Sequence, residues 1–177
     1  TTSTAQYNIS VGITALDAIT TGDHNTAVGY NSLTANTTGE KNTAYGSGSL
    51  ASCSTGKNNT SIGFNSLTSL TTNDTGDNAT GNTAVGFEVL TTLTTGYSNT
   101  AVGYHALKRA NTGTNNVAIG KGSLPYLTNG QLNIGIGSNG VGITIETGSN
   151  NVIIGAQADV NSSNTGASNQ IVIGYNA

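Results

Sequence analysis

The sequence predicts an all-β protein, a parallel β-solenoid (a β-helix or β-roll) of about ten 17-residue coils. Three observations lead to this fold class. A unit such as "NTAVGYNSL" returns along the chain in variant forms. A glycine follows the strand-like part of each unit at a nearly constant spacing. Val or Ile stands before that glycine, and Leu after it, in most units, so each unit can bury these residues by stacking on the next.

The glycines that anchor the units set the period. Their successive spacings are 17, 17, 17, 23, 17, 17, 17, 18 and 19 residues. The units cover almost the whole chain, so we expect residues 1–177 to form a single repeat domain. The anchor glycines are Gly12, Gly29, Gly46, Gly63, Gly86, Gly103, Gly120, Gly137, Gly155 and Gly174.

The residues before each anchor predict one short strand of about five residues per coil. Nine of the ten residues directly before an anchor are β-branched, and the other is Tyr45. Alternation gives the strand two faces, with Thr26 and Val28 on one and Ala27 on the other. Neither face carries a charge, so we expect one to face the inside of the coil and the other to face a neighbouring chain or a cover.

The segment after each anchor has a different spacing. A small residue, a Leu four past the anchor and an apolar residue seven past it are typical of one helical turn, with a second strand as the alternative. A "TTG" triplet or a variant follows, and its glycine can take a positive φ and turn the chain toward the next unit. The predicted core stack is Leu33, Leu50, Leu67, Leu90, Leu107 and Leu124.

An asparagine stands four residues before nearly every anchor. Stacked coils would align these side chains at one corner, where they can hydrogen-bond along the stack or to turn backbone. We therefore predict a structural role rather than a catalytic one; in the last unit Asn169 stands five residues before its anchor. The predicted ladder is Asn25, Asn42, Asn59, Asn82, Asn99, Asn116, Asn133 and Asn151.

Two regions depart from the repeat. Six extra residues lie within 71–81, where we expect a peripheral loop; Asp74 and Asp77 supply too few oxygens for a calcium site. The C-terminal coils, residues 133–177, are more apolar, and "VGITIE" (141–146) alternates like a strand. This drift predicts an oligomer contact or a docking surface near the C-terminal end.

Composition and motif searches exclude several classes. Charged residues are 7% of the chain and the net charge is −3, which argues against nucleic-acid binding. The sequence contains no run of 18 apolar residues, so it does not predict membrane insertion. His24 and His105 occupy unrelated repeat positions, and Cys53 stands where apolar residues are common and is expected to be buried and inert. We predict no enzyme activity, cofactor or metal.

One strand face carries small residues in nearly every coil. Such a strip would let two backbones approach closely, so it is the candidate surface for self-association into a homotrimer or a head-to-tail filament. The strip consists of Ala27, Ala44, Ala84, Ala101 and Ala118.

The repeats also resemble known families. "NTAVGYNSL", "NTAVGFEVL" and "NTAVGYHAL" resemble the shaft repeats of bacteriophage and marine-virus tail fibres, and "NQIVIGYNA" resembles segments near the end of such shafts. "NNVAIG" (115–120) is similar to the head repeats of trimeric autotransporter adhesins, whose period is shorter. These resemblances imply an extracellular fibre on a virion tail or a cell surface, usually homotrimeric, that attaches to a glycan or protein receptor.

A second function class remains open. Ice binding suits a regular Thr ladder on a flat, weakly charged solenoid, and one candidate ladder is Thr26, Thr43, Thr60, Thr83 and Thr100. A third class, a polysaccharide-degrading β-helix enzyme, is disfavoured because no acid pair recurs at a regular spacing.

Overall fold

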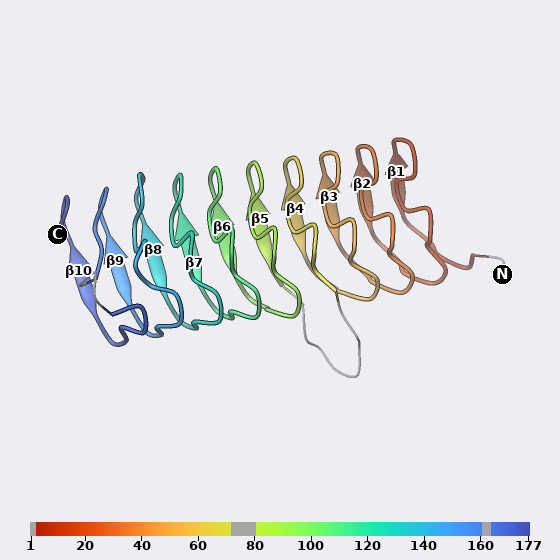
Figure 1. The fold of residues 1–177 in the computed structure, drawn as a ribbon. Helices are drawn as coiled ribbons and strands as arrows, with labels where there is room; N and C mark the ends of the chain where they lie inside the picture. Colours follow the sequence, from red (N-terminus) through yellow and green to blue (C-terminus); the bar gives the residue numbers. More distant parts are fainter. Residues whose placement is uncertain (1–2, 72–80, 161–163) are drawn as a thin grey trace.

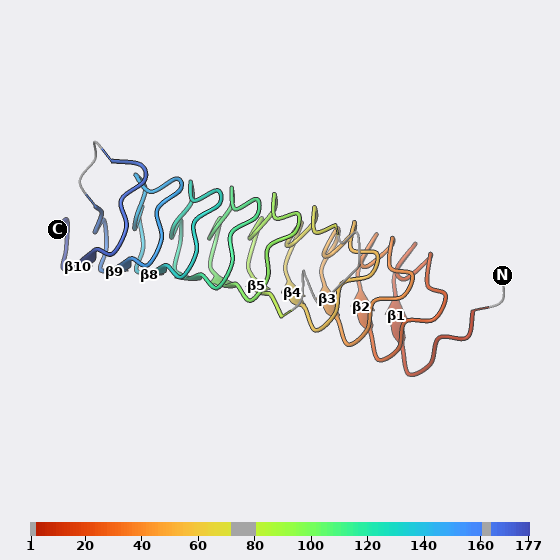
Figure 2. The ribbon, with the colours of Figure 1, turned by 90° about the horizontal axis from the view of Figure 1, so that it is seen from below.

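The protein is a rod of stacked coils with its two termini at opposite ends (Figures 1 and 2). The structure is a computed structural model, and it describes residues 3–71, 81–160 and 164–177. Ten three-residue strands form one parallel sheet in chain order, which confirms the predicted β-solenoid. The strands are β1 (Ile9–Val11), β2 (Thr26–Val28), β3 (Thr43–Tyr45), β4 (Thr60–Ile62), β5 (Thr83–Val85), β6 (Thr100–Val102), β7 (Val117–Ile119), β8 (Ile134–Ile136), β9 (Val152–Ile154) and β10 (Ile171–Ile173).

Equivalent residues of successive coils pair directly, and each coil is named here after its strand. In β2 and β3 the partners are Thr26 with Thr43, and Ala27 with Ala44. The same register continues across the six-residue insertion, where Thr60 of β4 pairs with Thr83 of β5. Most of the insertion, including Asp74 and Asp77, lies outside the described residues. The unbroken register on either side shows that the stack does not shift at this point.

Each strand is shorter than predicted because its backbone changes conformation at the anchor glycine. The ten anchors have φ between 117° and 150°, a region that side chains rarely adopt. At Gly29 a Cβ would also lie only 2.6 Å from the carbonyl carbon of Gly46 in the next coil. The glycine is therefore required both for its conformation and for the close stacking of backbones.

The segment after the anchor is neither a helical turn nor a second strand. The described residues contain no helix and no strand beyond the ten of the sheet. Leu33 has a φ of 49°, in the left-handed region, and its N–H donates to Ser49 O of the next coil at 3.0 Å. A right-handed helix excludes that φ, so the helical spacing instead marks a turn whose hydrogen bonds run between coils. Residues 141–144 form a turn as well, and no part of 141–146 is a strand.

The glycine of the "TTG" triplet has a different role from the one predicted. None of Gly22, Gly39, Gly96, Gly113 and Gly130 has a positive φ, so the predicted conformational role is wrong. A Cβ at Gly113 would lie 2.9 Å from the carbonyl oxygen of Gly130, so these glycines allow close approach between coils. The positive φ falls two residues later, as at Lys41, whose φ is 56°.

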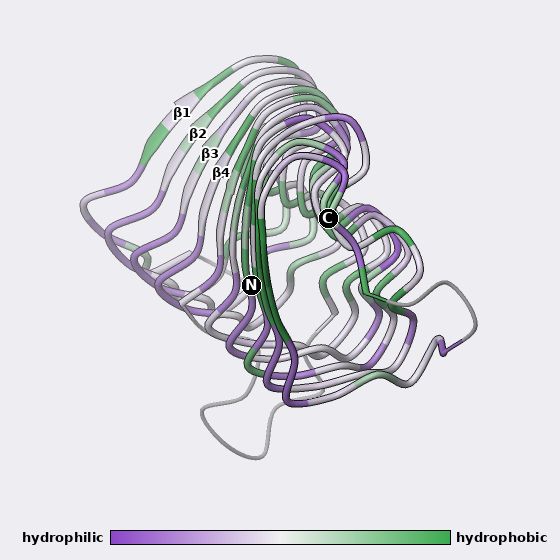
Figure 3. Ribbon diagram, turned by 90° about the vertical axis from the view of Figure 1, so that its left-hand side faces the viewer, coloured by the Kyte–Doolittle hydropathy of each residue, from purple (hydrophilic) through white to green (hydrophobic). Residues whose placement is uncertain are grey.

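The core runs along the inside of the rod, which Figure 3 views end-on. The middle residue of each strand from β2 to β9 points inward and is buried. The leucine of the turn, and the residue three positions after that leucine, face this middle strand residue from the other sides of the coil. The largest fully buried side chains are Leu33, Leu50, Leu67, Leu70, Leu90, Leu93, Leu107, Leu124, Leu127, Ile145, Ile153 and Val89.

Candidate functional site

The asparagine ladder lies at a buried corner of the rod and serves the fold. Asn42 donates from its backbone N–H and from Nδ2 to Asn25 Oδ1, at 3.0 and 3.1 Å. Its Nδ2 also donates to Gly56 O at 2.7 Å, and its own Oδ1 accepts two bonds from Asn59. Every donor and acceptor of the side-chain amide is thus used. The same pattern reaches Asn151, whose Oδ1 accepts from the N–H of Gln170 at 3.0 Å. Gln170, rather than Asn169, takes the ladder position in the last coil.

The predicted leucine stack is buried as expected. Leu33, Leu50, Leu67, Leu90, Leu107 and Leu124 each have no exposed surface. These side chains hold the turn against the sheet, so they too are structural.

The alanine strip does not lie on the surface, so its prediction as an assembly contact is wrong. Ala27, Ala44, Ala84, Ala101 and Ala118 are completely buried inside the coils. Space explains why the residues are small. In β8 the equivalent residue is Gly135, where a Cβ would lie 2.6 Å from Leu124 Cγ. The strand's middle residue faces the leucine stack across a narrow interior, so it must be small where Leu fills that interior.

The opposite strand face is the surface that the coils leave open. We call it the outer sheet face; it consists of the residues three and one before each anchor, from Ile9 to Ile173. None of these side chains is charged, and five of them are threonines. Several are large and well exposed, such as Tyr45 at 58% and Ile171 at 76%. The C-terminal strands, nearest the viewer in Figure 3, consist of strongly hydrophobic residues.

An aromatic row continues from this face onto the adjoining turn. Phe64 stacks on Phe87 with ring centroids 5.5 Å apart, and Phe87 stacks on Tyr104 at 5.4 Å. Beside the row, Glu88 Oε2 accepts from Lys108 Nζ at 2.8 Å and lies 3.1 Å from His105 Nε2. The bond from Lys108 is the main cause of a lowered Glu88 pKa. The aromatic row spans three successive coils and the charged cluster spans two, so together they tie neighbouring turns at the surface.

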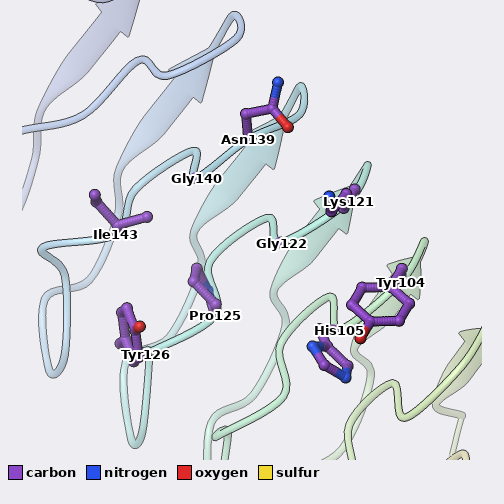
Figure 4. A pocket seen from close by; sticks show the side chains of 9 residues that line it. All are labelled: Tyr104, His105, Lys121, Gly122, Pro125, Tyr126, Asn139, Gly140 and Ile143. Carbon is purple, nitrogen blue, oxygen red and sulfur yellow. The ribbon is translucent and has the colours of Figure 1, made fainter.

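A groove opens where the aromatic row ends. We call it the β7 groove, and its volume is about 360 Å³ (Figure 4). Residues from three successive turns surround it, and the turn that follows β7 contributes the largest share of them. Its lining residues are Tyr104, His105, Lys121, Gly122, Pro125, Tyr126, Asn139, Gly140 and Ile143. Sequence reasoning did not identify this groove, although the 18-residue spacing between Gly137 and Gly155 marks the irregular coil that forms one side of it.

Outside this region, the described residues form one ion pair, in which Lys57 Nζ lies 3.6 Å from Glu40 Oε1. No group of three His, Cys, Asp or Glu side chains that could hold a metal occurs within residues 3–71, 81–160 and 164–177. His24 stacks on Tyr7 with centroids 4.9 Å apart. Cys53 is buried as predicted, and burial raises the pKa of its thiol to about 11. A thiol with that pKa is protonated at neutral pH and is a poor nucleophile.

The fold defines the class of the protein as a parallel β-solenoid repeat protein. Comparison with protein-family models, curated proteins and solved structures gave no match. No helix in the described part of the chain is long and apolar enough to span a membrane. The functional argument therefore depends on the surfaces described above.

Proposed function

We propose that the chain is a structural segment of an extracellular fibre or adhesin, on a virion tail or a cell surface, that self-assembles side by side. One observation carries the proposal: the outer sheet face is uncharged over the whole length of the rod. Monomeric soluble proteins rarely expose a continuous apolar patch of more than a few hundred Å². A stripe of exposed and half-buried Val, Ile and Tyr along all ten strands is better explained as a contact surface.

A second copy of the chain fits this surface best. The rows of the outer sheet face repeat once per coil, at the spacing of parallel strands. A partner with the same coil spacing can contact this face at every coil. A second copy of the chain necessarily has that spacing. Lateral packing of copies also buries a stripe that runs along the rod, which end-to-end contact does not. A homotrimer, the form implied by the resemblance to fibre shafts, satisfies this requirement.

The test is the oligomeric state of matched variants by analytical ultracentrifugation. Thr83→Lys with Thr100→Lys places two charges on the outer sheet face. Thr38→Lys with Thr95→Lys places the same two charges on exposed turn residues away from it. We expect the wild type and the turn variant to sediment as oligomers and the outer-face variant as a monomer, because burying an unpaired charge is costly. A monomeric wild type at high concentration, or an outer-face variant that assembles normally, would refute self-assembly.

Ice binding is the second candidate, and one observation favours it. Thr26, Thr43, Thr60, Thr83 and Thr100 stack in register on the outer sheet face. The row is single and gives way to Val117 in the next coil. A measurement of thermal hysteresis decides between the two: activity in the wild type that is lost in Thr60→Val with Thr83→Val would favour ice binding.

A further inference from the structure

The hollow of the β7 groove has an identifiable origin in the repeat. Two residues past the anchor, successive coils carry His105, Gly122 and Asn139. Gly122 has no side chain, so a gap opens between the neighbours above and below it in the row (Figure 4). The next coil contains one extra residue, Gly140. The inter-coil hydrogen bonds show the insertion: the N–H of Leu107 donates to Ser123 O, whereas the N–H of Leu124 donates to Val141 O, which is one residue further along the chain than the repeat requires. A missing side chain and an inserted glycine thus combine to form a concave site among these turns.

Aromatic rings line this hollow from two sides. The stacked row of Phe64, Phe87 and Tyr104 ends at Tyr104, because the next residue of the row is Lys121. Tyr104 is 47% exposed and lines the groove. On the other side, Tyr126 is held by Arg109, whose guanidinium carbon lies 4.8 Å from the ring centroid. Rings fixed in this way offer flat apolar faces at little cost in conformational entropy.

The groove also lies within a stretch of the acidic chain that is rich in cationic residues. Three of the five Lys and Arg residues, Lys108, Arg109 and Lys121, lie close together in sequence. No Asp or Glu occurs from residue 89 to residue 145. Two carboxylates bonded close to the groove already have partners: Glu88 contacts Lys108 and His105, and Asp159 accepts from the N–H and Oγ1 of Thr144. Lys121 is exposed and has no ion pair among the described residues.

From this combination we propose that the β7 groove binds an acidic oligosaccharide, a sugar chain that carries carboxylates. Tyrosine rings can stack on the C–H faces of sugar rings, and the Asn139 amide can pair with hydroxyl groups as both donor and acceptor. The Lys121 ammonium supplies the charge for a carboxylate. The groove is open and extends over three coils, which suits a segment of a chain rather than a single small ion. This inference rests on the proposed fibre or adhesin function and names the class of ligand that such a segment would bind.

The binding test uses the full chain, titrated by isothermal calorimetry with a hexamer of galacturonic acid. A neutral galactose hexamer and a hexamer of glutamic acid serve as comparison probes. We expect the acidic sugar to bind and each comparison probe to bind at least about tenfold more weakly. Equal binding of the neutral sugar, stronger binding of the acidic peptide, or no binding of the galacturonate would each overturn the proposal.

Matched variants locate the site. Lys121→Gln and Tyr126→Ala should each weaken galacturonate binding by about tenfold. The control variants Lys41→Gln and Tyr30→Ala remove an exposed lysine and an exposed tyrosine outside the groove and should bind like the wild type. Equal loss in groove and control variants would overturn the assignment. Circular dichroism melts confirm folding, and sedimentation of the same samples keeps the two proposals separate. A monomeric wild type that binds galacturonate refutes self-assembly alone, whereas an oligomer that does not bind refutes the groove alone.

Discussion

The central and C-terminal coils fill the same interior from opposite walls. In the β6 coil the turn contributes the large side chain, Leu107, and the strand contributes the small one, Ala101; both are fully buried. Between β8 and β9 the sizes are exchanged, with Gly142 in the turn and Ile153 in the strand. A Cβ at Gly142 would lie 3.1 Å from Ile153 Cδ1, so the isoleucine occupies space that a turn leucine would need.

The backbone, in contrast, is the same in both regions. Gly103 and Gly155 have φ values of 131° and 130°. Asn99 and Asn151 each donate twice to the preceding asparagine of the ladder, at distances between 2.9 and 3.1 Å. The comparison teaches that the glycine and asparagine positions are set by backbone stacking, whereas core volume can move from one wall to another.

The largest effect should follow from changing an anchor glycine in either region. A Cβ added at Gly103 would lie 2.6 Å from the carbonyl carbon of Gly120 in the next coil. A Cβ added at Gly155 would lie 2.7 Å from the carbonyl carbon of Gly174. We expect Gly103→Ala and Gly155→Ala each to cost about 3–5 kcal/mol of unfolding free energy, from backbone strain and overpacking together. Urea denaturation measures this. Gly81→Asn is the control, because a Cβ there has 4.0 Å to its nearest neighbour. A tolerated alanine at either anchor would contradict the stacking argument.

Truncation of the large core side chain should come next and should be similar in the two regions. Leu107→Ala and Ile153→Ala each leave a cavity and should cost about 2–5 kcal/mol. Leu132→Ala is the matched control, since Leu132 is 56% exposed. If the loss of unfolding free energy falls within this range for one variant and outside it for the other, the C-terminal coils are not an equivalent core.

A double substitution tests the exchange of core volume directly. Gly142→Leu should destabilise the chain because Leu124 and Ile153 surround that position. Its backbone is not an obstacle, since Gly142 has a φ of 61° and the turn leucines of other coils have φ near 50°. Adding Ile153→Ala should recover part of the loss, with a coupling of about 1–3 kcal/mol in a double-mutant cycle. Additive losses would mean that the two positions do not share one space.

The sequence predicts the parts of this structure that depend on repetition. The period, one strand per coil, the asparagine ladder and the buried leucines follow because stacked coils must place equivalent residues at equivalent points. The sequence did not predict which face of the strand points into the coil. Thr26 and Val28 on one face and Ala27 on the other are all uncharged, so polarity does not distinguish inside from outside. The burial of Ala27 and its equivalents shows that the small residue faces inward, and the narrow space beside Leu124 explains why.

The turn after the anchor and the β7 groove were not predicted, although each has a signal in the sequence. The spacing of Leu33 and Asn36 is helical, but a left-handed leucine followed by bonds between coils gives the same spacing. The β7 groove arises from departures from the repeat, at Gly122 and Gly140, and a search for regularity passes over such positions. When the coils are aligned residue by residue, Gly122 stands out as a missing side chain and Gly140 as an extra residue.

The smallest effect concerns charge, which also differs between the regions. In the central coils the hydrogen bond from Lys108 to Glu88 lowers the carboxyl pKa from its ordinary value of 4.5. In the C-terminal coils Glu146 is exposed and forms no ion pair with any described residue. A pKa that is lower in the folded state means that the unfolded chain binds the proton more tightly. The stabilisation from Glu88 is therefore fully present above about pH 4.5 and is lost as the pH falls through the lower, folded value.

Urea melts of Glu88→Gln and Glu146→Gln between pH 3 and pH 7 measure this difference. Glu88→Gln should be slightly less stable than the wild type at pH 7, and the two curves should converge at acid pH. Glu146→Gln should follow the wild type throughout. High salt should reduce the Glu88 effect, because the pair lies at the surface and is screened. A gap between wild type and Glu88→Gln that widens toward low pH would reverse the sign of the linkage and contradict the role of Lys108.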